Sequence, residues 1–259
     1  RHKNLKSNDP HGDSPQLPKP PDWTQLYWQN TNGFQLADDN GGTFLTANEQ
    51  LQVLQADAAG FSEINLDTTK SSVTNKLHTA IRKTSKHCHM KSSSSPTTAT
   101  HDYKPGGTVT LIRDNLCSRF YSKGADKLGR WSFITLNCRG ERKVTFVTIY
   151  QPCIGKPKHD GSMTVISQQY QHHLQSGRQQ PENVRKHFIQ DLRIFVSAHR
   201  AMGESIIMAG DFNEVIGTTS SGMSKVCRDF NLVDPIHQRH GSPSNQFATW
   251  IDGKETLDY

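Results

Sequence analysis

Short apolar segments of strand length alternate with amphipathic segments of helix length along most of this 259-residue chain. The strand-like segments are rich in β-branched and aromatic residues and are bounded by turn formers. In the helix-like segments, apolar residues recur every three or four positions, as they do on the buried face of a helix. This alternation, without any internal repeat, favours a single α/β or α+β sandwich.

The pattern places the individual elements along the chain. A capping box at 46–49 and a cap on Asp67 or Thr68 predict the starts of two helices. Apolar spacing predicts two more helices at 184–196 and 223–230, and the serine-rich stretch 92–98 is expected to be a loop. Strands are expected at 26–28, 58–63, 108–112, 131–137, 143–150, 205–209, 247–251 and 256–259.

Composition separates a tail from a folded part. Residues 1–22 contain five of the twelve prolines and almost no apolar side chains, so we expect a disordered, Pro-rich tail or linker there and one folded domain over 23–259. No apolar run approaches the roughly 18 residues that span a bilayer, and the first 25 residues lack the apolar stretch of a signal peptide. We therefore expect neither a membrane protein nor a secreted one.

The cysteines indicate the redox compartment of the protein, and the charge bears on the kind of partner it binds. The five cysteines are scattered and form no CxxC pair, which argues against a disulfide framework or a zinc knuckle and favours a reducing compartment. Thirty Lys and Arg against 24 Asp and Glu give a net charge of +6. That excess suits a polyanionic partner such as nucleic acid, but it also suits an enzyme without one.

The segment Gly210-Asp211-Phe212-Asn213 follows an apolar strand and carries the strongest chemical signal. Strand alternation places Asp211 and Asn213 on the same side of the strand end. A carboxylate there can orient or deprotonate a water, beside an amide that holds a phosphate oxygen. The alternative is an Asp-initiated turn without a function.

Two other predicted strands end in similar groups. Asn30 and Asn32 repeat the same spacing, and Glu63 ends the strand that follows them along the chain. Because ligands gather at the carboxyl ends of strands in open α/β folds, these side chains are expected to share one site. Oxygen ligands of this kind select a hard cation, Mg²⁺ or Mn²⁺.

Five short motifs now support a resemblance to a known family. In this order they resemble the motifs of the endonuclease/exonuclease/phosphatase family, which includes pancreatic-type deoxyribonuclease, apurinic/apyrimidinic endonucleases and the endonuclease domains of non-LTR retrotransposons. The resemblance runs from about Trp23 to the last residue and implies a four-layer α/β sandwich of the DNase I-like type. The motifs are Asn30-Thr31-Asn32-Gly33, Asp57-Ala58-Ala59-Gly60-Phe61-Ser62-Glu63, Thr148-Ile149-Tyr150-Gln151-Pro152, Gly210-Asp211-Phe212-Asn213 and Leu257-Asp258-Tyr259.

The resemblance assigns roles at matching positions. It makes Glu63 the principal metal carboxylate, with Asn30 as a second metal-site residue and Asn32 at a position that is Asp in some members. It makes Asp211 the residue that activates the attacking water and Asn213 the one that braces the transition-state phosphate.

Three further positions follow from the same resemblance. Tyr150 matches a phosphate-contacting tyrosine, although Cys153 stands where Asn is often found. Asp258 matches the acid that orients the family's catalytic histidine. Arg130 matches an arginine before the central hairpin, for which an ion pair at the strand edge is the favoured role.

The family pattern continues beyond the last motif present here. Members run on from the Leu-Asp-Tyr motif to a Ser-Asp-His motif, so this domain is expected to be incomplete at its C-terminus and to lack its last strands. No other histidine replaces the missing one by motif. The pair His87 and His89, at the end of a basic helix, and the pair His237 and His240 are interpreted as surface residues.

The expected function is Mg²⁺-dependent phosphodiester hydrolysis by a DNA-nicking endonuclease of a retroelement, acting in the nucleus and fused to reverse transcriptase. Basic residues that include Arg82 and Lys83 are expected to bind the DNA, although a solvated helix face explains them equally well. A Gln-rich segment beginning at Ser167 also resembles retroelement endonucleases. The alternatives are a catalytically dead nucleic-acid-binding remnant and a phosphoinositide or lipid phosphodiesterase of the same family.

Overall fold

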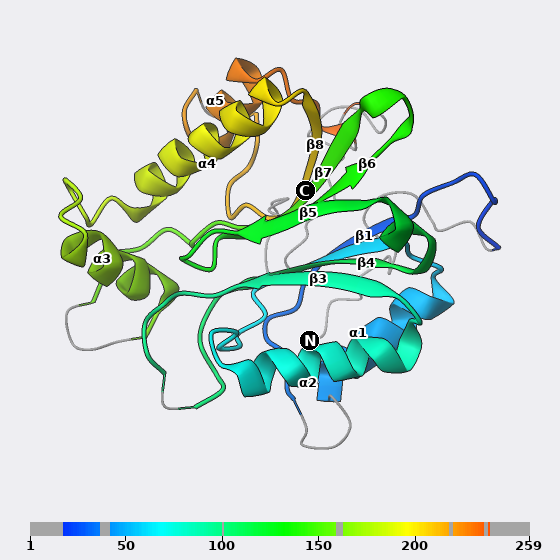
Figure 1. The fold of residues 1–259 in the computed structure, drawn as a ribbon. Helices are drawn as coiled ribbons and strands as arrows, with labels where there is room; N and C mark the ends of the chain where they lie inside the picture. Colours follow the sequence, from blue (N-terminus) through cyan, green and yellow to red (C-terminus); the bar gives the residue numbers. More distant parts are fainter. Residues whose placement is uncertain are drawn as a thin grey trace, which may run out of the picture.

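Two four-stranded sheets pack face to face in the computed structural model (Figure 1). The structure describes residues 18–36, 42–99, 101–158, 163–217, 220–235 and 238. No helix within these ranges is both long and apolar enough to cross a bilayer.

The first sheet has the strand order β1-β2-β4-β3. Strand β1 (Leu26–Asn30) is parallel to β2 (Ala58–Ser62), and their register places Asn30 opposite Ser62. Strand β4 (Thr108–Arg113) is antiparallel to both β2 and β3 (Cys88–Ser93). The carboxyl ends of β1 and β2 therefore lie at the same end of this sheet.

The second sheet has the order β5-β6-β7-β8. Strands β5 (Phe120–Ala125), β6 (Trp131–Asn137) and β7 (Lys143–Tyr150) form an antiparallel meander, and η2 (Arg139–Glu141) turns the chain between β6 and β7. Strand β8 (Glu204–Asp211) pairs in parallel with β7, so that Tyr150 lies opposite Asp211.

Helices cover the outer faces of both sheets (Figure 1). Helices α1 (Gly42–Val53) and α2 (Ser71–Thr84) bury Phe44, Leu51, Val73, Leu77 and Ile81 in the core of the first sheet. On the second sheet, α4 (Val184–Ala201) and α5 (Gly222–Asp229) bury Phe188, Leu192, Val196, Met223 and Val226. A third apolar cluster, which includes Ile112, Ile134 and Phe146, fills the space between the sheets. The expected four-layer α/β sandwich is confirmed.

Several predicted boundaries are wrong. Helix α1 begins at Gly42, so the predicted capping box lies inside it, where the Asn48 side chain donates to the Phe44 carbonyl at 2.7 Å. Helix α2 begins after Lys70, because Asp67 accepts hydrogen bonds from Thr69 and Lys104 instead of capping the helix.

Three elements were not predicted as such. Ser92 and Ser93 end strand β3, so the serine-rich loop begins later than predicted, and His89 belongs to this strand and not to a helix end. Strand β5 and helix α3 (Val165–Gln175) were missed altogether. The strands predicted at 247–251 and 256–259 lie outside the described residues.

Candidate active site

Four strands bring polar side chains together at one end of the sandwich. Asn30 ends β1, Glu63 follows β2, Tyr150 ends β7 and Asp211 ends β8. The Asn30 Nδ2 donates to Glu63 Oε2 at 3.1 Å and to Asp211 Oδ2 at 2.8 Å. Two carboxylates from different sheets therefore share one nitrogen, well within the roughly 10 Å that a shared metal–phosphate assembly allows.

Asp211 and Asn213 form one unit, as their spacing in the sequence suggests. Asp211 Oδ1 accepts from the Asn213 backbone N–H at 2.8 Å, and Oδ2 accepts from Asn213 Nδ2 at 3.0 Å. The same amide nitrogen donates to the Gln151 carbonyl at 2.8 Å. These contacts, together with that from Asn30, fix the orientation of a carboxylate that is only 5% exposed.

Tyr150 lies buried beside the two carboxylates. Burial raises the pKa of its phenol far above the usual value, and the negative charge at Glu63, Cys153 and Asp211 raises that pKa further. Tyr150 therefore remains a protonated donor at every physiological pH.

The other predicted site residues lie in different places. Asn32 is exposed and contacts the cluster through its backbone N–H, which donates to Asn30 Oδ1 at 2.9 Å. Asp258 lies outside the described residues. Arg82 and Lys83 are in the last turn of α2, where Arg113 donates to the Thr84 carbonyl. That turn is at the far end of β2 from Glu63, so the structure does not bring these two cations to the cluster.

Left-handed backbone conformations shape this end of the sandwich. Glu63 has φ +53° and Asn213 has φ +44°, conformations that a glutamate in particular rarely adopts. Gly210 has φ +136°, and a Cβ atom on it would lie 2.1 Å from the Ile149 carbonyl oxygen. Only glycine allows β8 to approach β7 so closely just before Asp211.

Replacing Gly210 with alanine is therefore expected to lower the free energy of unfolding by about 2 kcal/mol and to displace Asp211. Urea denaturation measures the loss of stability, and the rate of plasmid nicking measures the displacement of Asp211. Gly140→Ala is a suitable control, because it has a left-handed backbone but nothing within 4 Å of the added Cβ. If Gly210→Ala were no less stable than this control, the close approach of the strands would not matter.

Sequence reasoning missed the residues that support the loop of Asn213. Arg185, in the first turn of α4, donates to the Pro152 carbonyl at 2.5 Å, to the Asn213 carbonyl at 3.1 Å and to Glu214 at 3.3 Å. Burial lowers the pKa of Arg185, although the negative charge of Glu214 acts in the opposite direction and raises it. The position of Glu214 directly after the Asn213 motif was the available signal.

Cys153 and Arg130 were also singled out from the sequence, and the structure gives the contacts of both residues. Cys153 donates from its thiol to Asn213 Oδ1 at 3.3 Å, and burial followed by the charge of Asp211 raises the pKa of this thiol. Arg130 pairs with Asp126 at 2.6 Å and with Asp191 at 2.8 Å, which fits the ion-pair role favoured for it.

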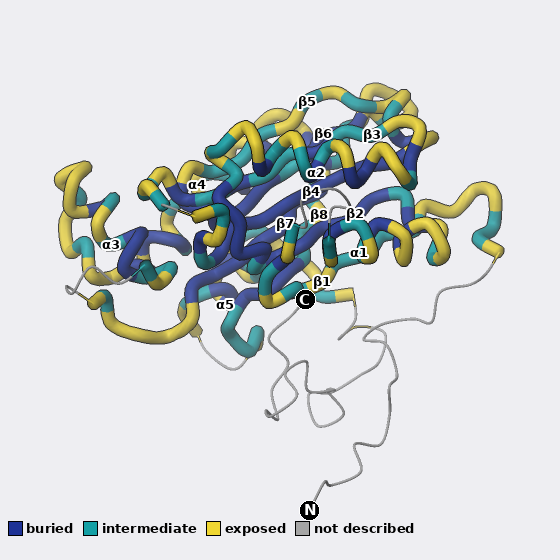
Figure 2. The backbone as a smooth tube through the Cα atoms, turned by 90° about the horizontal axis from the view of Figure 1, so that it is seen from below, coloured by how far each residue is buried: buried dark blue, intermediate teal, exposed yellow. Residues whose placement is uncertain are grey.

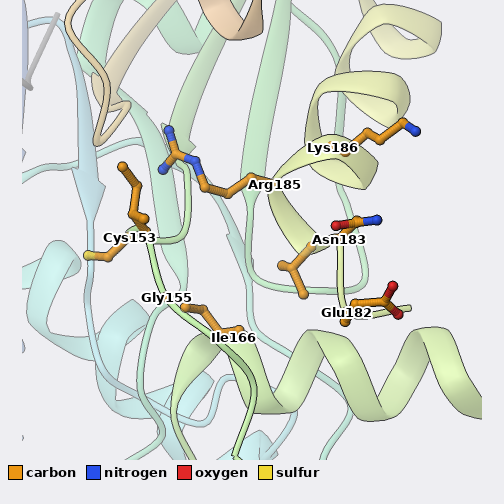
Figure 3. A pocket seen from close by; sticks show the side chains of 9 residues that line it. Cys153, Gly155, Ile166, Glu182, Asn183, Arg185 and Lys186 are labelled. Atoms are coloured by element: carbon orange, nitrogen blue, oxygen red, sulfur yellow. The ribbon is translucent and has the colours of Figure 1, made fainter. Parts of the chain in front are cut away.

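A cavity of about 160 Å³ opens beside the Asn213 loop (Figure 3). It lies between Cys153 and Gly155 on one side and the start of α4 on the other, with Ile166 of α3 at its floor. Arg185 and Lys186 leave α4 in opposite directions, and Arg185 points toward the chain near Cys153. The cavity is thus continuous with the residues that hold Asn213.

The donor atoms of the cluster fit a hard cation. Glu63 and Asp211 supply carboxylate oxygens, and Asn30, whose nitrogen donates to both of them, supplies an amide oxygen as a further hard donor. Across the described ranges, no three His, Cys, Asp or Glu side chains gather in a metal-binding group. A metal held here would therefore need the amide oxygen, water or substrate to complete its ligands.

Comparisons with known proteins find similar solved structures, although no family model and no curated protein matches this sequence. An endonuclease/exonuclease/phosphatase family protein from Leptotrichia buccalis is 14% identical, with a TM-score of 0.45, over 80% of this chain and 72% of that one. An AP endonuclease from Archaeoglobus fulgidus is 13% identical, with a TM-score of 0.46, over 89% and 80% of the two chains. An endonuclease/exonuclease/phosphatase from Beutenbergia cavernae is 12% identical, with a TM-score of 0.40, over 79% of this chain and 52% of that one. Likeness at this level assigns no activity to the chain.

Proposed function

We propose that this protein hydrolyses phosphodiester bonds with a divalent cation and belongs to the endonuclease/exonuclease/phosphatase family. The convergence of Asn30, Glu63 and Asp211 through one shared amide nitrogen carries the proposal. Two carboxylates joined in this way at the end of two sheets serve no evident packing role, because they lie at a polar strand end and not in an apolar core. Their chemistry suits phosphate ester cleavage.

Each side chain has a distinct task in this reaction. Asp211 accepts a proton from the attacking water, and Asn30 and Asn213 hold its carboxylate in place. The buried, protonated Tyr150 hydroxyl donates a hydrogen bond to a non-bridging phosphate oxygen, and the Asn213 amide would support the same group in the transition state by exchanging its contact with the Gln151 carbonyl for the phosphate oxygen.

A divalent cation completes the chemistry. Glu63 would hold it, and the Asn30 amide oxygen, which also accepts from the Asn32 backbone N–H, would be a second donor to the ion; the Asn32 side-chain amide is the neighbouring group able to assist. When bound, such an ion neutralises charge on the phosphate oxygens. Mg²⁺ is the proposed ion, since oxygen donors favour it and Mn²⁺ over softer metals.

Nucleic acid is the proposed substrate class, with DNA nicking by a retroelement endonuclease in the nucleus as the specific reaction. Its support is the net charge of +6 and the resemblance of the ordered motifs to retrotransposon endonuclease domains. A link to reverse transcriptase belongs to the same proposal.

Nicking of supercoiled plasmid in Mg²⁺, compared with the same reaction in EDTA, tests the proposal. We expect Glu63→Gln to raise the Mg²⁺ concentration needed for half-maximal nicking by at least about tenfold, because the principal carboxylate ligand is lost. Glu182→Gln, at the rim of the cavity, is the control and should leave this concentration unchanged.

The same preparation separates the alternatives. Release of phosphate from inositol phosphates without plasmid nicking would identify a phosphoinositide phosphodiesterase. DNA binding without Mg²⁺-dependent nicking would identify a binding protein without catalytic activity. Nicking with no dependence on Glu63 would overturn the assignment of the metal site.

A further inference from the structure

The cations of this chain are concentrated in one continuous stretch. Residues 68–101 contain six Lys and Arg and no Asp or Glu, against a net charge of +6 for the whole chain. This stretch therefore accounts for a local charge as large as that of the entire protein. Helix α2 and strand β3 lie within it.

The fold brings these elements to one side of the sandwich. Strand β3 is the edge of the first sheet and β5 is the edge of the second, and the two edges are in contact. Helix α2, β3 and β5 all lie in the foreground of Figure 1 and in the upper half of Figure 2, where the molecule is seen from below. They form a lateral face, away from the opposite edges β1 and β8.

Four cations define this basic face: Arg82 in the last turn of α2, Lys86 two residues after that helix, Lys91 on β3 and Lys123 on β5. Three of them are exposed, and Lys91 is half-buried. Lys123 joins the two edges by donating to the Met90 carbonyl at 3.1 Å. Among the described residues, none of the four forms an ion pair with a carboxylate.

Burial and the positive charge of the basic face lower the pKa values of two neighbouring histidines. Burial lowers the pKa of His78, and the charges of Lys123 and Arg82 lower it further. Burial and then the charge of Lys123 lower the pKa of His89 on β3. Lys123 and Arg82 therefore lie close enough to these imidazoles to disfavour their protonated forms, and a bound polyanion would reduce this effect.

The basic face is separate from the candidate active site. Residue Cys88, at the start of β3, pairs with Arg113, and Ala58 pairs with the preceding Ile112, so the end of α2 lies level with the start of β2. Glu63 follows the other end of β2. One strand length and two strand spacings separate the two places, a distance of roughly 20 Å.

We propose that Arg82, Lys86, Lys91 and Lys123 form a second nucleic-acid-binding face, which holds the phosphate backbone of a long substrate at a distance from the cleaved bond. The choice of nucleic acid as the ligand rests on the proposed function, whereas the location and charge of the face do not. At about 3.4 Å per base pair, the face reaches phosphates roughly six base pairs from the reaction centre. Short substrates cannot reach it.

The test is the binding of a DNA hairpin with a 4-bp stem, too short to span the roughly 20 Å between the two places, and of a 30-bp duplex. Both are measured by fluorescence anisotropy in EDTA over a range of salt concentrations. We expect Arg82→Gln/Lys86→Gln to weaken binding of the 30-bp duplex by about tenfold and to reduce the salt slope by about 0.9 for each lost phosphate contact. Binding of the 4-bp hairpin should not change. Arg139→Gln/Arg142→Gln removes two exposed cations from the turn between β6 and β7 and serves as the charge-matched control.

Each contrary result has a definite meaning. Equal binding of the 30-bp duplex by the two double variants would overturn the proposal. Equal weakening for the hairpin and the duplex would place Arg82 and Lys86 at the active site instead. A poly-glutamate peptide that competes as well as the 30-bp duplex would assign the face to acidic protein segments.

The outcome is also distinguishable from that of the proposed function. EDTA suppresses metal-dependent cleavage, so the binding measurement does not require a functioning catalytic site. A length-dependent loss of affinity in a protein that nicks no DNA would retain the basic face and reject the proposed reaction. Plasmid nicking by a protein whose double variant shows no length-dependent loss of affinity would retain the proposed reaction and reject the basic face.

Discussion

Asp211→Asn is expected to lower the rate of plasmid nicking by about 10²- to 10⁴-fold, which is the usual contribution of a general base. The substitution keeps the shape of the side chain and one acceptor oxygen, so most of the hydrogen bonds from Asn30 and Asn213 can persist. What it removes is the ability to accept the proton of the attacking water. Initial nicking rates at saturating Mg²⁺ measure the effect.

The control for this prediction is Asp229→Asn. Asp229 is the last residue of α5 and pairs with Lys225 and Arg193, whereas Met223, near the other end of this helix, contacts Glu214. This variant should leave the nicking rate unchanged. Thermal unfolding of both variants excludes a general loss of structure. If Asp211→Asn nicked plasmid as fast as the wild type, Asp211 would not be the base, and the assignment of roles in this cluster would fall.

Strong periodicity made part of the fold predictable. Helix α4 places Val184, Phe188, Leu192 and Val196 on one buried face at intervals of four residues, and this spacing is visible in the sequence. The strands of the β6–β7 hairpin alternate β-branched and aromatic residues around a turn, and both were predicted with the observed boundaries.

The missed elements lack such local signals. Strand β3, with the sequence Cys-His-Met-Lys-Ser-Ser, has no β-branched residue and is held in place by its pairing with β4. Helix α3 buries Gln168, Gln169 and His173, so its inner face is polar and gives no apolar pattern. In both cases tertiary contacts outweigh local propensity.

The candidate site was predictable to the extent that its residues stand at strand ends. Asn30, Glu63 and Asp211 could be proposed together because carboxyl ends of strands gather in one place. The role of Arg185 could not be predicted, because this residue lies on a helix and is 28 and 29 residues before its partners Asn213 and Glu214 in the chain. The position of Arg82 at the opposite end of β2 likewise depends on the direction in which α2 crosses the sheet.

A buried ion pair holds the segment that follows Glu63. Lys104 and Asp67 are 0% and 2% exposed in their side chains and lie 2.6 Å apart. Lys104 also donates to the Ser95 carbonyl at 2.7 Å, and Asp67 accepts from the Thr69 hydroxyl at 2.6 Å. The pair therefore ties together the segments around Asp67, Ser95 and Lys104, the first of which follows Glu63 by four residues.

Lys104→Met is expected to lower the free energy of unfolding by about 3–5 kcal/mol at neutral pH, because it leaves the Asp67 carboxylate buried without its cation. Urea denaturation measures the change. Lys225→Met, which breaks an exposed pair with Asp229, should cost less than about 1 kcal/mol and is the control.

The pH dependence of this loss gives the prediction a second, independent test. Burial alone would raise the pKa of Asp67, but hydrogen bonds from Lys104 and Thr69 and the charge of Lys104 outweigh it and lower that pKa. In the wild type, the carboxylate therefore stabilises the fold above its ordinary pKa of about 3.9, and this contribution is lost as the pH falls through the lowered value.

In Lys104→Met the hydrogen bond and the charge of Lys104 are lost and only the contacts with Thr69 still oppose burial, so the pKa of Asp67 rises and this residue takes up a proton at a higher pH than in the wild type. The stability difference between the two proteins should consequently narrow as the pH falls toward 4. Asp67→Asn/Lys104→Met, which removes both charges, should recover part of the loss at neutral pH. A difference that stays constant with pH, or a double variant no more stable than the single one, would show that Lys104 acts through packing and not through its charge.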